Sequence, residues 1–159
     1  RCWRFGQTKP VEAHIIVAAE LTNNASDAGE LPTMLQAVKD SLGALPKQAL
    51  ADTGYKAEAV FEALAGSGCD LVVALGREGK KALRFDPQRS PHTAAMAAKL
   101  QTDEGKAAYR RRKWIAEPPN GWIKNVLGFR QFSLRGLHRV QAEWKLVCLA
   151  LNLRRMAAM

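Results

Sequence analysis

Two acidic residues stand where a carboxylate could take part in chemistry, and the first is Asp52. It ends the short apolar segment 48–52, QALAD, which predicts a strand, and a glycine that permits a sharp turn follows at Gly54. In open α/β sheets, sites form outside the carboxyl ends of the strands, so Asp52 would face such a crevice. The alternative role of Asp52 is to cap or turn the chain into the next helix.

The second acidic residue is Glu117, which lies in an unusually basic stretch. Four consecutive basic residues occupy 110–113, and Lys124 follows Glu117 by seven positions. On a helix, residues seven apart share one face, so Glu117 and Lys124 would lie together. The alternative reading is a charge-balancing acid at the start of a helix, where the macrodipole favours an anion.

If Asp52 and Glu117 come together in the fold, they could hold Mg²⁺, a hard ion that prefers oxygen ligands. Two such ions about 4 Å apart activate a nucleophile and stabilise the leaving oxygen in phosphoryl transfer. We therefore expect the two carboxylates to lie within about 10 Å of each other, a separation that metal bridging tolerates. The pair alone permits this chemistry without specifying it.

The charge of the chain is concentrated in its last third. Residues 1–100 hold 12 Lys and Arg against 11 Asp and Glu, a net charge of +1, whereas residues 101–159 hold 12 against 4, a net charge of +8. A basic surface of this kind attracts phosphate polyanions through Coulomb attraction and counterion release. A merely solvated helix face is the alternative, but the clustering favours nucleic acid as a partner.

The first half of the chain alternates predicted strands and helices. Predicted strands cover 14–22, 48–52 and 70–75, and predicted helices follow the first two of them. The first helix begins at a capping box formed by Asp27 and Glu30 and ends at Gly43, and the second covers 56–65 and stops at Gly66. Short apolar strands joined by helices predict an α/β layer in which the last strands pair in parallel.

The second half is predicted to be helical and basic. Residues 76–92 predict a basic, mobile insertion. A short helix is expected after it at 93–100, and a strongly basic helix at 103–116. Pro118 and Pro119 are expected to interrupt that helix, so that Glu117 marks the start of a new one. The last predicted helix is long and amphipathic, and its apolar face consists of Leu137, Val140, Trp144, Val147, Cys148 and Leu151.

Other features exclude several classes of protein. Cys2, Cys69 and Cys148 are odd in number and far apart, which argues against disulfides and zinc and favours a cytoplasmic setting. The three histidines also lack ligand spacing, and no apolar run is long enough to span a membrane, so no membrane partner is expected. The opening RCWRFGQTKP shows neither an initiator Met nor a signal peptide, so we expect a fragment.

Three blocks of this sequence resemble the DDE-type transposases of insertion sequences. Residues 51–55, ADTGY, resemble the block around the second catalytic Asp of that family. The run YRRRKWIAEPPNGWIK resembles the family's Tyr-Arg-Glu-Lys block, with the spacing Y-x₂-R-x₄-E-x₆-K, and GFRQFSLRGLHRVQAEWKLVCLALNLRRM resembles its usual C-terminal run. The resemblance covers about residues 14–156 and leaves residues 1–13 unassigned. The combination of the block around Asp52 with the Tyr-Arg-Glu-Lys block is specific, whereas either of these two blocks alone would be a weak signal.

The resemblance implies an α/β fold with a partial RNase H-like core, in which helices flank a mixed sheet and a helical region ends the chain. Asp52 and Glu117 would be the second and third acids of a catalytic triad that binds Mg²⁺ or Mn²⁺. Arg112, Lys113 and Lys124 would contact double-stranded DNA, at transposon ends and target, with Tyr109 helping to position it. Water attack would nick the transposon end, and the freed 3′-hydroxyl would attack the target.

One departure from the family pattern matters most. Nothing before residue 14 resembles the strand that carries the family's first catalytic Asp, and we assign Asp27 to helix capping instead. We therefore expect residues 14–156, with a basic insertion at about 76–103, to be the C-terminal part of a catalytic domain that is inactive alone. The alternatives are a non-catalytic DNA-binding remnant and another RNase H-like nuclease or recombinase. The family also implies a homo-oligomer, although no interface is legible in the sequence.

Overall fold

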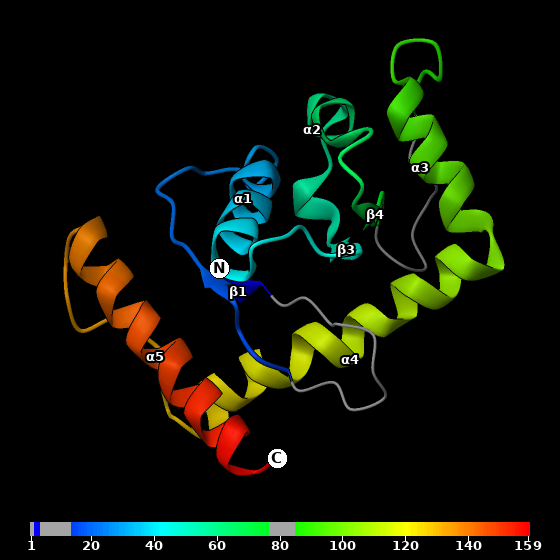
Figure 1. Cartoon of the computed structure of the whole chain (residues 1–159). Helices are drawn as coiled ribbons and strands as arrows, with labels where there is room; N and C mark the ends of the chain where they lie inside the picture. Colours follow the sequence, from blue (N-terminus) through cyan, green and yellow to red (C-terminus); the bar gives the residue numbers. More distant parts are fainter. Residues whose placement is uncertain (1, 4–13, 77–84) are drawn as a thin grey trace.

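The computed structural model describes residues 2–3, 14–76 and 85–159, without the side chains of Cys2, Trp3, Lys113, Ala116 and Glu117. The described residues form a mixed α/β structure with two small sheets and two long C-terminal helices (Figure 1). In chain order the elements are β1 (Cys2–Trp3), β2 (Ala18–Ala19), α1 (Glu30–Leu42), β3 (Gln48–Ala51), the 3-10 helix η1 (Thr53–Tyr55), α2 (Glu58–Leu64), β4 (Asp70–Val73), α3 (Pro91–Gln101), α4 (Asp103–Asn125) and α5 (Leu137–Ala157). None of the helices that the structure describes combines the length and apolarity that a membrane span needs.

The parallel strand pair predicted from the sequence is present. β3 pairs with β4 in parallel, with Gln48 opposite Asp70 and Ala51 opposite Val73, and the chain crosses between them through α2. Both strands are short and apolar, so they bury their inner residues against helices on either side. The main core cluster forms here, and its least exposed side chains include Leu31, Leu35, Val38 and Val73.

α1 ends where the sequence predicted but begins differently. Gly43 adopts a left-handed φ of 78° and its N–H bonds to Lys39 O at 2.7 Å, as expected of a glycine stop. The predicted capping box of Asp27 and Glu30 is wrong, because the N-cap is Gly29 and no side chain caps the helix. The carboxylate of Glu30 instead accepts hydrogen bonds from side chains of the preceding loop, which draw it away from the helix end.

The predicted strand at 14–22 is also largely wrong, since only β2 is a strand and it pairs antiparallel with β1. The surrounding backbone bonds to side-chain amides of α5 instead. Ile16 N donates to Asn152 Oδ1 at 2.8 Å, and Asn152 Nδ2 donates to Ile16 O at 2.7 Å. Gln141 bonds in the same way to Leu21 N and Ala19 O. The helix rises about 16 Å over the eleven residues from Gln141 to Asn152, and the extended chain covers about the same distance over the five residues from Ile16 to Leu21. The two amides of α5 are therefore spaced to reach both ends of the extended segment.

α4 runs unbroken through Pro118 and Pro119, so the predicted interruption at these residues is wrong. Proline's fixed φ is itself helical, and its cost in a helix interior is a lost donor and a clash with the preceding turn, about 3 kcal/mol. Packing of Pro119 and of the helical turn after it offsets that cost. Pro119 is buried, and Ile123, one turn further on, is 3% exposed in the second core cluster.

The second core cluster joins α5 to the end of α4 and to the extended segment before α1. It is built around Trp144, Cys148 and Leu151 of α5, with Ile16 and Ile123. The predicted inner face of the C-terminal helix is therefore confirmed at its centre. Leu137, which was expected on that face, is 43% exposed, because it is the first residue of the helix and lies beyond the cluster.

Candidate metal and nucleic-acid site

Asp52 lies directly after β3 and caps the 3-10 helix η1. Its Oδ1 accepts a hydrogen bond from Gly54 N at 2.9 Å, so the predicted turn-forming role is present. Tyr55, at the end of the same turn, is 5% exposed and anchors the turn in the main core. The Asp52 side chain is exposed, so the hydrogen bond orients the carboxylate without burying it.

Glu117 lies inside α4 (Asp103–Asn125), more than three turns after its start and about two turns before its end. It therefore does not start a new helix, and the helix-start explanation of its charge does not hold. Its side chain is outside those that the structure describes. The expected approach of the Asp52 and Glu117 carboxylates to within about 10 Å remains a prediction.

Tyr109 and Arg112 come together on α4, three residues apart. The Arg112 guanidinium carbon lies 5.2 Å from the centre of the Tyr109 ring. Arg112 Nε is buried and has no hydrogen-bond partner in the part of the chain that the structure describes. A stacked guanidinium is preorganised for a phosphate or a carboxylate, anions that arginine binds through paired donors.

The two predicted lysines differ in what the structure reveals. Lys124 is exposed in the last turn of α4, where its charge also complements the helix macrodipole. It lies seven residues after Glu117 on one continuous helix, so both residues share a face, as the spacing predicted. Lys113 belongs to α4, but its side chain lies outside the described part of the structure.

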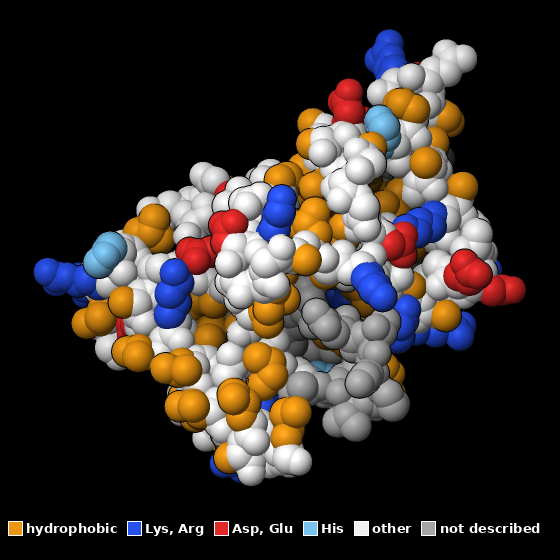
Figure 2. Space-filling model, viewed as in Figure 1, with side chains coloured by type: hydrophobic (Ala, Val, Ile, Leu, Met, Phe, Trp, Pro, Cys, Tyr) orange, Lys and Arg blue, Asp and Glu red, His pale blue; other side chains and the backbone are white. Residues whose placement is uncertain are grey.

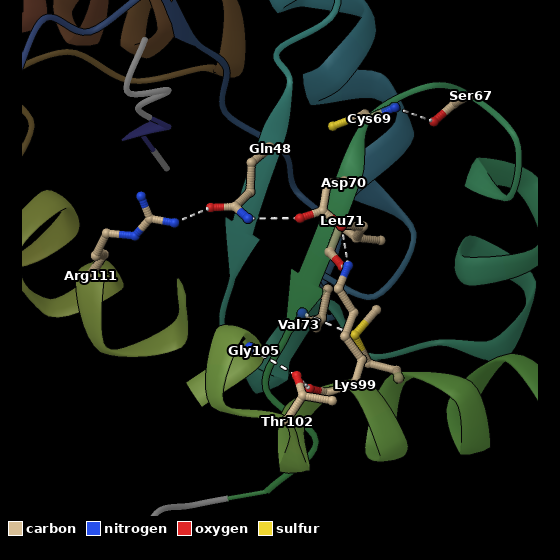
Figure 3. Close-up of polar contacts among 11 residues, drawn as sticks. Gln48, Ser67, Cys69, Asp70, Leu71, Val73, Lys99, Thr102, Gly105 and Arg111 are labelled. Carbon is tan, nitrogen blue, oxygen red and sulfur yellow. Dashed lines mark hydrogen bonds and ion pairs between the residues drawn. The ribbon is translucent and has the colours of Figure 1, made fainter. Parts of the chain in front are cut away.

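A polar network that the sequence did not reveal ties α4 to the parallel strands (Figure 3). Arg111 Nη2 donates to Gln48 Oε1 at 2.9 Å, and Gln48 Nε2 donates to Asp70 Oδ2 at 2.7 Å. Lys99 of α3 completes the network, because its Nζ bonds to Asp70 Oδ1 and, at 2.7 Å, to Leu71 O. Four elements thus meet at the amino ends of β3 and β4, whereas Asp52 follows the carboxyl end of β3.

The network also determines the charge of Asp70. Partial burial raises the pKa of Asp70, but the hydrogen bonds from Lys99 and Gln48 outweigh it and hold the pKa below its usual value of 3.8. Asp70 is therefore ionised and paired at neutral pH. Because Arg111 is bound by this network, the consecutive arginines have separate surroundings, with Arg110 exposed and Arg112 stacked on Tyr109.

Glu58 positions α3, the helix that carries Lys99. The N-cap of α3 is Ser90, which makes no side-chain cap, and Glu58 of α2 supplies the missing acceptors. Its carboxylate accepts bonds from His92 N at 2.7 Å, Thr93 N at 2.8 Å and Thr93 Oγ1 at 2.6 Å. Acceptors from a neighbouring element satisfy a helix start as well as a local cap does. No local sequence signal marks this role.

The described residues can be tested as ligands of a divalent ion. Among the side chains that the structure describes, no three His, Cys, Asp or Glu residues gather into a metal-binding group. Asp52 fits Mg²⁺ chemically, since it is an exposed carboxylate with one oxygen held by Gly54 N. Asp70 fits poorly, because Lys99 and Gln48 occupy its oxygens.

Comparison with protein families places most of the chain in a known family. Residues 45–157 match the family described as the transposase DDE domain. The matched region contains β3, Asp52, all of α4 and all of α5. Comparisons with curated proteins and with solved structures found no match. Because the matched region spans most of the chain and includes both predicted acids, the chain belongs to the transposase DDE domain family.

Proposed function

We propose that the chain is the C-terminal part of a DDE transposase catalytic domain with a partial RNase H-like core. In the complete protein this domain would cut and join DNA strands during transposition. The observation that carries the proposal is the family match over residues 45–157, which contains the two predicted acids and the Tyr-Arg-Lys residues in the expected order. The parallel β3–β4 pair and the packing of α4 against it support the RNase H-like assignment.

In this proposal Asp52 and Glu117 hold Mg²⁺ or Mn²⁺ as two of the family's three acids. The bound metal would activate the attacking oxygen and stabilise the leaving oxygen. Asp52 is suited to ligation because Gly54 N fixes one of its oxygens at 2.9 Å, which limits the rotation of the carboxylate. Glu117 and Lys124 share one face of α4, so an acid that binds metal would lie beside a cation that binds the DNA backbone.

Arg112 is the residue proposed to contact DNA most directly, with Lys113 and Lys124 as further phosphate contacts. Tyr109 holds the guanidinium by stacking at 5.2 Å, so a phosphate meets a side chain that has already lost much of its freedom. The buried Nε lacks an acceptor among the described residues, which costs free energy.

DNA binding tests this proposal through the salt dependence of affinity. Fluorescence anisotropy with a duplex should show binding that weakens as salt rises. Arg112→Ala should weaken binding and reduce the slope of log affinity against log salt by about 1. Arg89→Ala is the matched control, since Arg89 is a highly exposed arginine before α3. Equal affinities of the wild type and Arg112→Ala would contradict the assignment.

A nicking assay separates the transposase fragment from a different nuclease. With Mg²⁺ or Mn²⁺ and a duplex substrate, the chain alone should bind without robust cleavage, because the proposed site has two acids of three. Robust metal-dependent cleavage that Asp52→Asn abolishes would overturn the proposed incompleteness and leave a catalytic role for Asp52. Cleavage that survives Asp52→Asn would refute the role of Asp52 itself.

A further inference from the structure

Arg154, in the last turn of α5, lies over an aromatic ring of the neighbouring helix. Its guanidinium carbon is 4.6 Å from the centre of the Trp122 ring, near the end of α4. The two helix ends lie side by side (Figure 1), and the second core cluster joins them through Ile123 and Leu151. At this distance the ring attracts the cation and restricts a long side chain. Arg154 is therefore held in place although it is exposed.

No described carboxylate neutralises Arg154. Glu143 is the last acidic residue in the sequence, and it lies eleven positions, or about 16 Å, before Arg154 on the same helix. Its carboxylate already accepts bonds from Ser133 N and Leu134 N. On the face shown in Figure 2, no Asp or Glu side chain lies over the last turns of α5. The described part of the chain thus leaves the guanidinium donors of Arg154 available to an external anion.

A basic residue in the last turn of a helix also complements the helix macrodipole. That role needs only a positive charge, which a lysine without an aromatic neighbour would supply equally well. It does not account for a guanidinium placed over an indole ring. A guanidinium in this position keeps N–H donors at its edge, and arginine binds phosphate through such paired donors.

We propose that Arg154, positioned by Trp122, contacts a phosphate of double-stranded DNA. The inference rests on the proposed DNA binding and adds a residue of α5 to contacts that otherwise come from α4. Trp122 follows Arg112 by ten residues, about 15 Å along α4. Successive phosphates of one strand are only about 3.4 Å apart along the duplex axis, so the two arginines would contact different phosphates. Their contributions to the affinity for DNA should therefore add.

Fluorescence anisotropy of the full chain with a labelled DNA duplex tests the proposal. Arg154→Ala should weaken binding about 10-fold, because it removes a charged hydrogen-bond donor. It should also lower the slope of log affinity against log salt by about 1, and the double variant with Arg112→Ala should lower the slope by about 2. Arg89→Ala, which removes an exposed arginine before α3, is the matched control and should change neither quantity.

Two further variants separate a phosphate contact from a role in stability. Arg154→Lys keeps the charge, so the slope should stay, while the affinity falls about 3-fold because lysine lacks the planar paired donors. Trp122→Leu keeps an apolar side chain but removes the ring. It should weaken DNA binding when Arg154 is present and have no further effect on binding in the Arg154→Ala background. Circular dichroism should show the wild-type helix content in the Arg154 variants.

The possible failures are distinguishable. If the wild type binds the duplex and Arg154→Ala binds it with the same affinity and slope, the role of Arg154 is refuted and the contacts of α4 stand. If Arg154→Ala lowers the thermal unfolding midpoint but leaves the slope unchanged, Arg154 serves only the contact between α4 and α5, and the inference is wrong. A wild type that does not bind the duplex would refute the proposed DNA binding and this inference with it.

Discussion

The molecule contains two buried regions that stabilise their backbones differently. In the parallel-strand region (β3, β4 and helices α1 to α3), strand hydrogen bonds and helices satisfy the backbone locally. In the α5 region (residues 14–21, the end of α4 and α5), the extended segment relies on two side-chain amides of α5, Gln141 and Asn152. The first region has its partners in neighbouring elements of the chain, whereas the second joins residues more than 100 positions apart.

The difference matters for function because α4 crosses from one region to the other. Its first half is tied to β3 by Arg111 and Gln48, and its last turns pack against Trp144 and Cys148 of α5. The proposed DNA and metal residues of α4, from Tyr109 to Lys124, lie on the stretch that carries both attachments, whereas Asp52 follows β3. A substitution that weakens either region should therefore also alter the proposed site on α4. We expect substitutions in the parallel-strand region to cost more free energy of unfolding than those in the α5 region.

The largest expected effect is at the junction of α3 and α4. A Cβ added at Gly105 would lie 2.0 Å from the backbone oxygen of Lys99, so Gly105→Ala must move one helix relative to the other. We expect a loss of about 3 kcal/mol in the free energy of unfolding, measured by urea denaturation. Gly121→Ala, in the same helix with nothing within 4 Å, should instead stabilise by about 1 kcal/mol. Similar effects of the two substitutions would show that the junction is not tightly packed.

The next effect tests the amide contacts of the α5 region. Asn152→Ala removes the partners of both Ile16 N and Ile16 O, leaving two partly buried backbone groups unsatisfied. We expect a loss of about 2 kcal/mol. Hydrogen exchange should rise at residues 16–21 while β3 and β4 stay protected. Asn23→Ala is the control, because Asn23 is exposed. A uniform rise in exchange over both regions would contradict the proposed division.

A smaller effect is expected where α4 meets the strands. Arg111 is exposed, so its bond to Gln48 should contribute less than about 1 kcal/mol. A double-mutant cycle of Arg111→Ala and Gln48→Ala measures this coupling free energy directly. Arg110→Ala, at the exposed neighbouring position, supplies the matched cycle with Gln48 and should give no coupling. A coupling free energy of zero between Arg111 and Gln48 would show that their hydrogen bond does not stabilise the contact between α4 and β3.

The smallest effects should appear on acidification. Burial raises the pKa of Glu58, but hydrogen bonds from Thr93 and His92 lower it further, so it lies below 4.5. The N–H groups of Ser133 and Leu134 lower the pKa of Glu143 likewise. A lowered pKa in the folded state adds stability that is present above pH 4.5 and lost as pH falls through the folded pKa.

Glu58→Gln and Glu143→Gln should each flatten this loss below pH 4.5, as followed by circular dichroism. Hydrogen exchange should locate the first effect at α3 and the second at residues 133–134, because these are the groups that the two carboxylates contact. Unchanged acid sensitivity in both variants would mean that other carboxylates govern unfolding at low pH.

The elements that the sequence predicted well are those whose signals are local. β3, β4, α1 and α2 follow from short apolar runs, and Gly43 and Gly66 end their helices with positive φ. The continuous α4 was missed because a local proline rule competes with packing at Ile123 and Pro119, which no local pattern reveals. The strand at 14–22 was overextended because its apolar composition does not show that amides of α5 satisfy its backbone.

In the candidate site, too, local features could be predicted from the sequence and features that depend on the fold could not. The blocks around Asp52 and Glu117 were found from the sequence because their residue types and spacing are a family pattern, and the matched region contains both. The Gln48–Asp70–Lys99 network was missed, since it depends on the register of two strands and the position of α3.

The most direct test of the central claim asks whether Asp52 and Glu117 share one metal ion. Electron paramagnetic resonance of Mn²⁺ titrated into the full chain measures binding by the loss of the free-ion signal. Asp52→Asn and Glu117→Gln should each weaken Mn²⁺ binding about 10-fold, whereas Asp40→Asn, at an exposed position in α1, should not. If Asp52→Asn weakens binding and Glu117→Gln leaves it unchanged, the two acids do not share a site, and the account of the site is wrong.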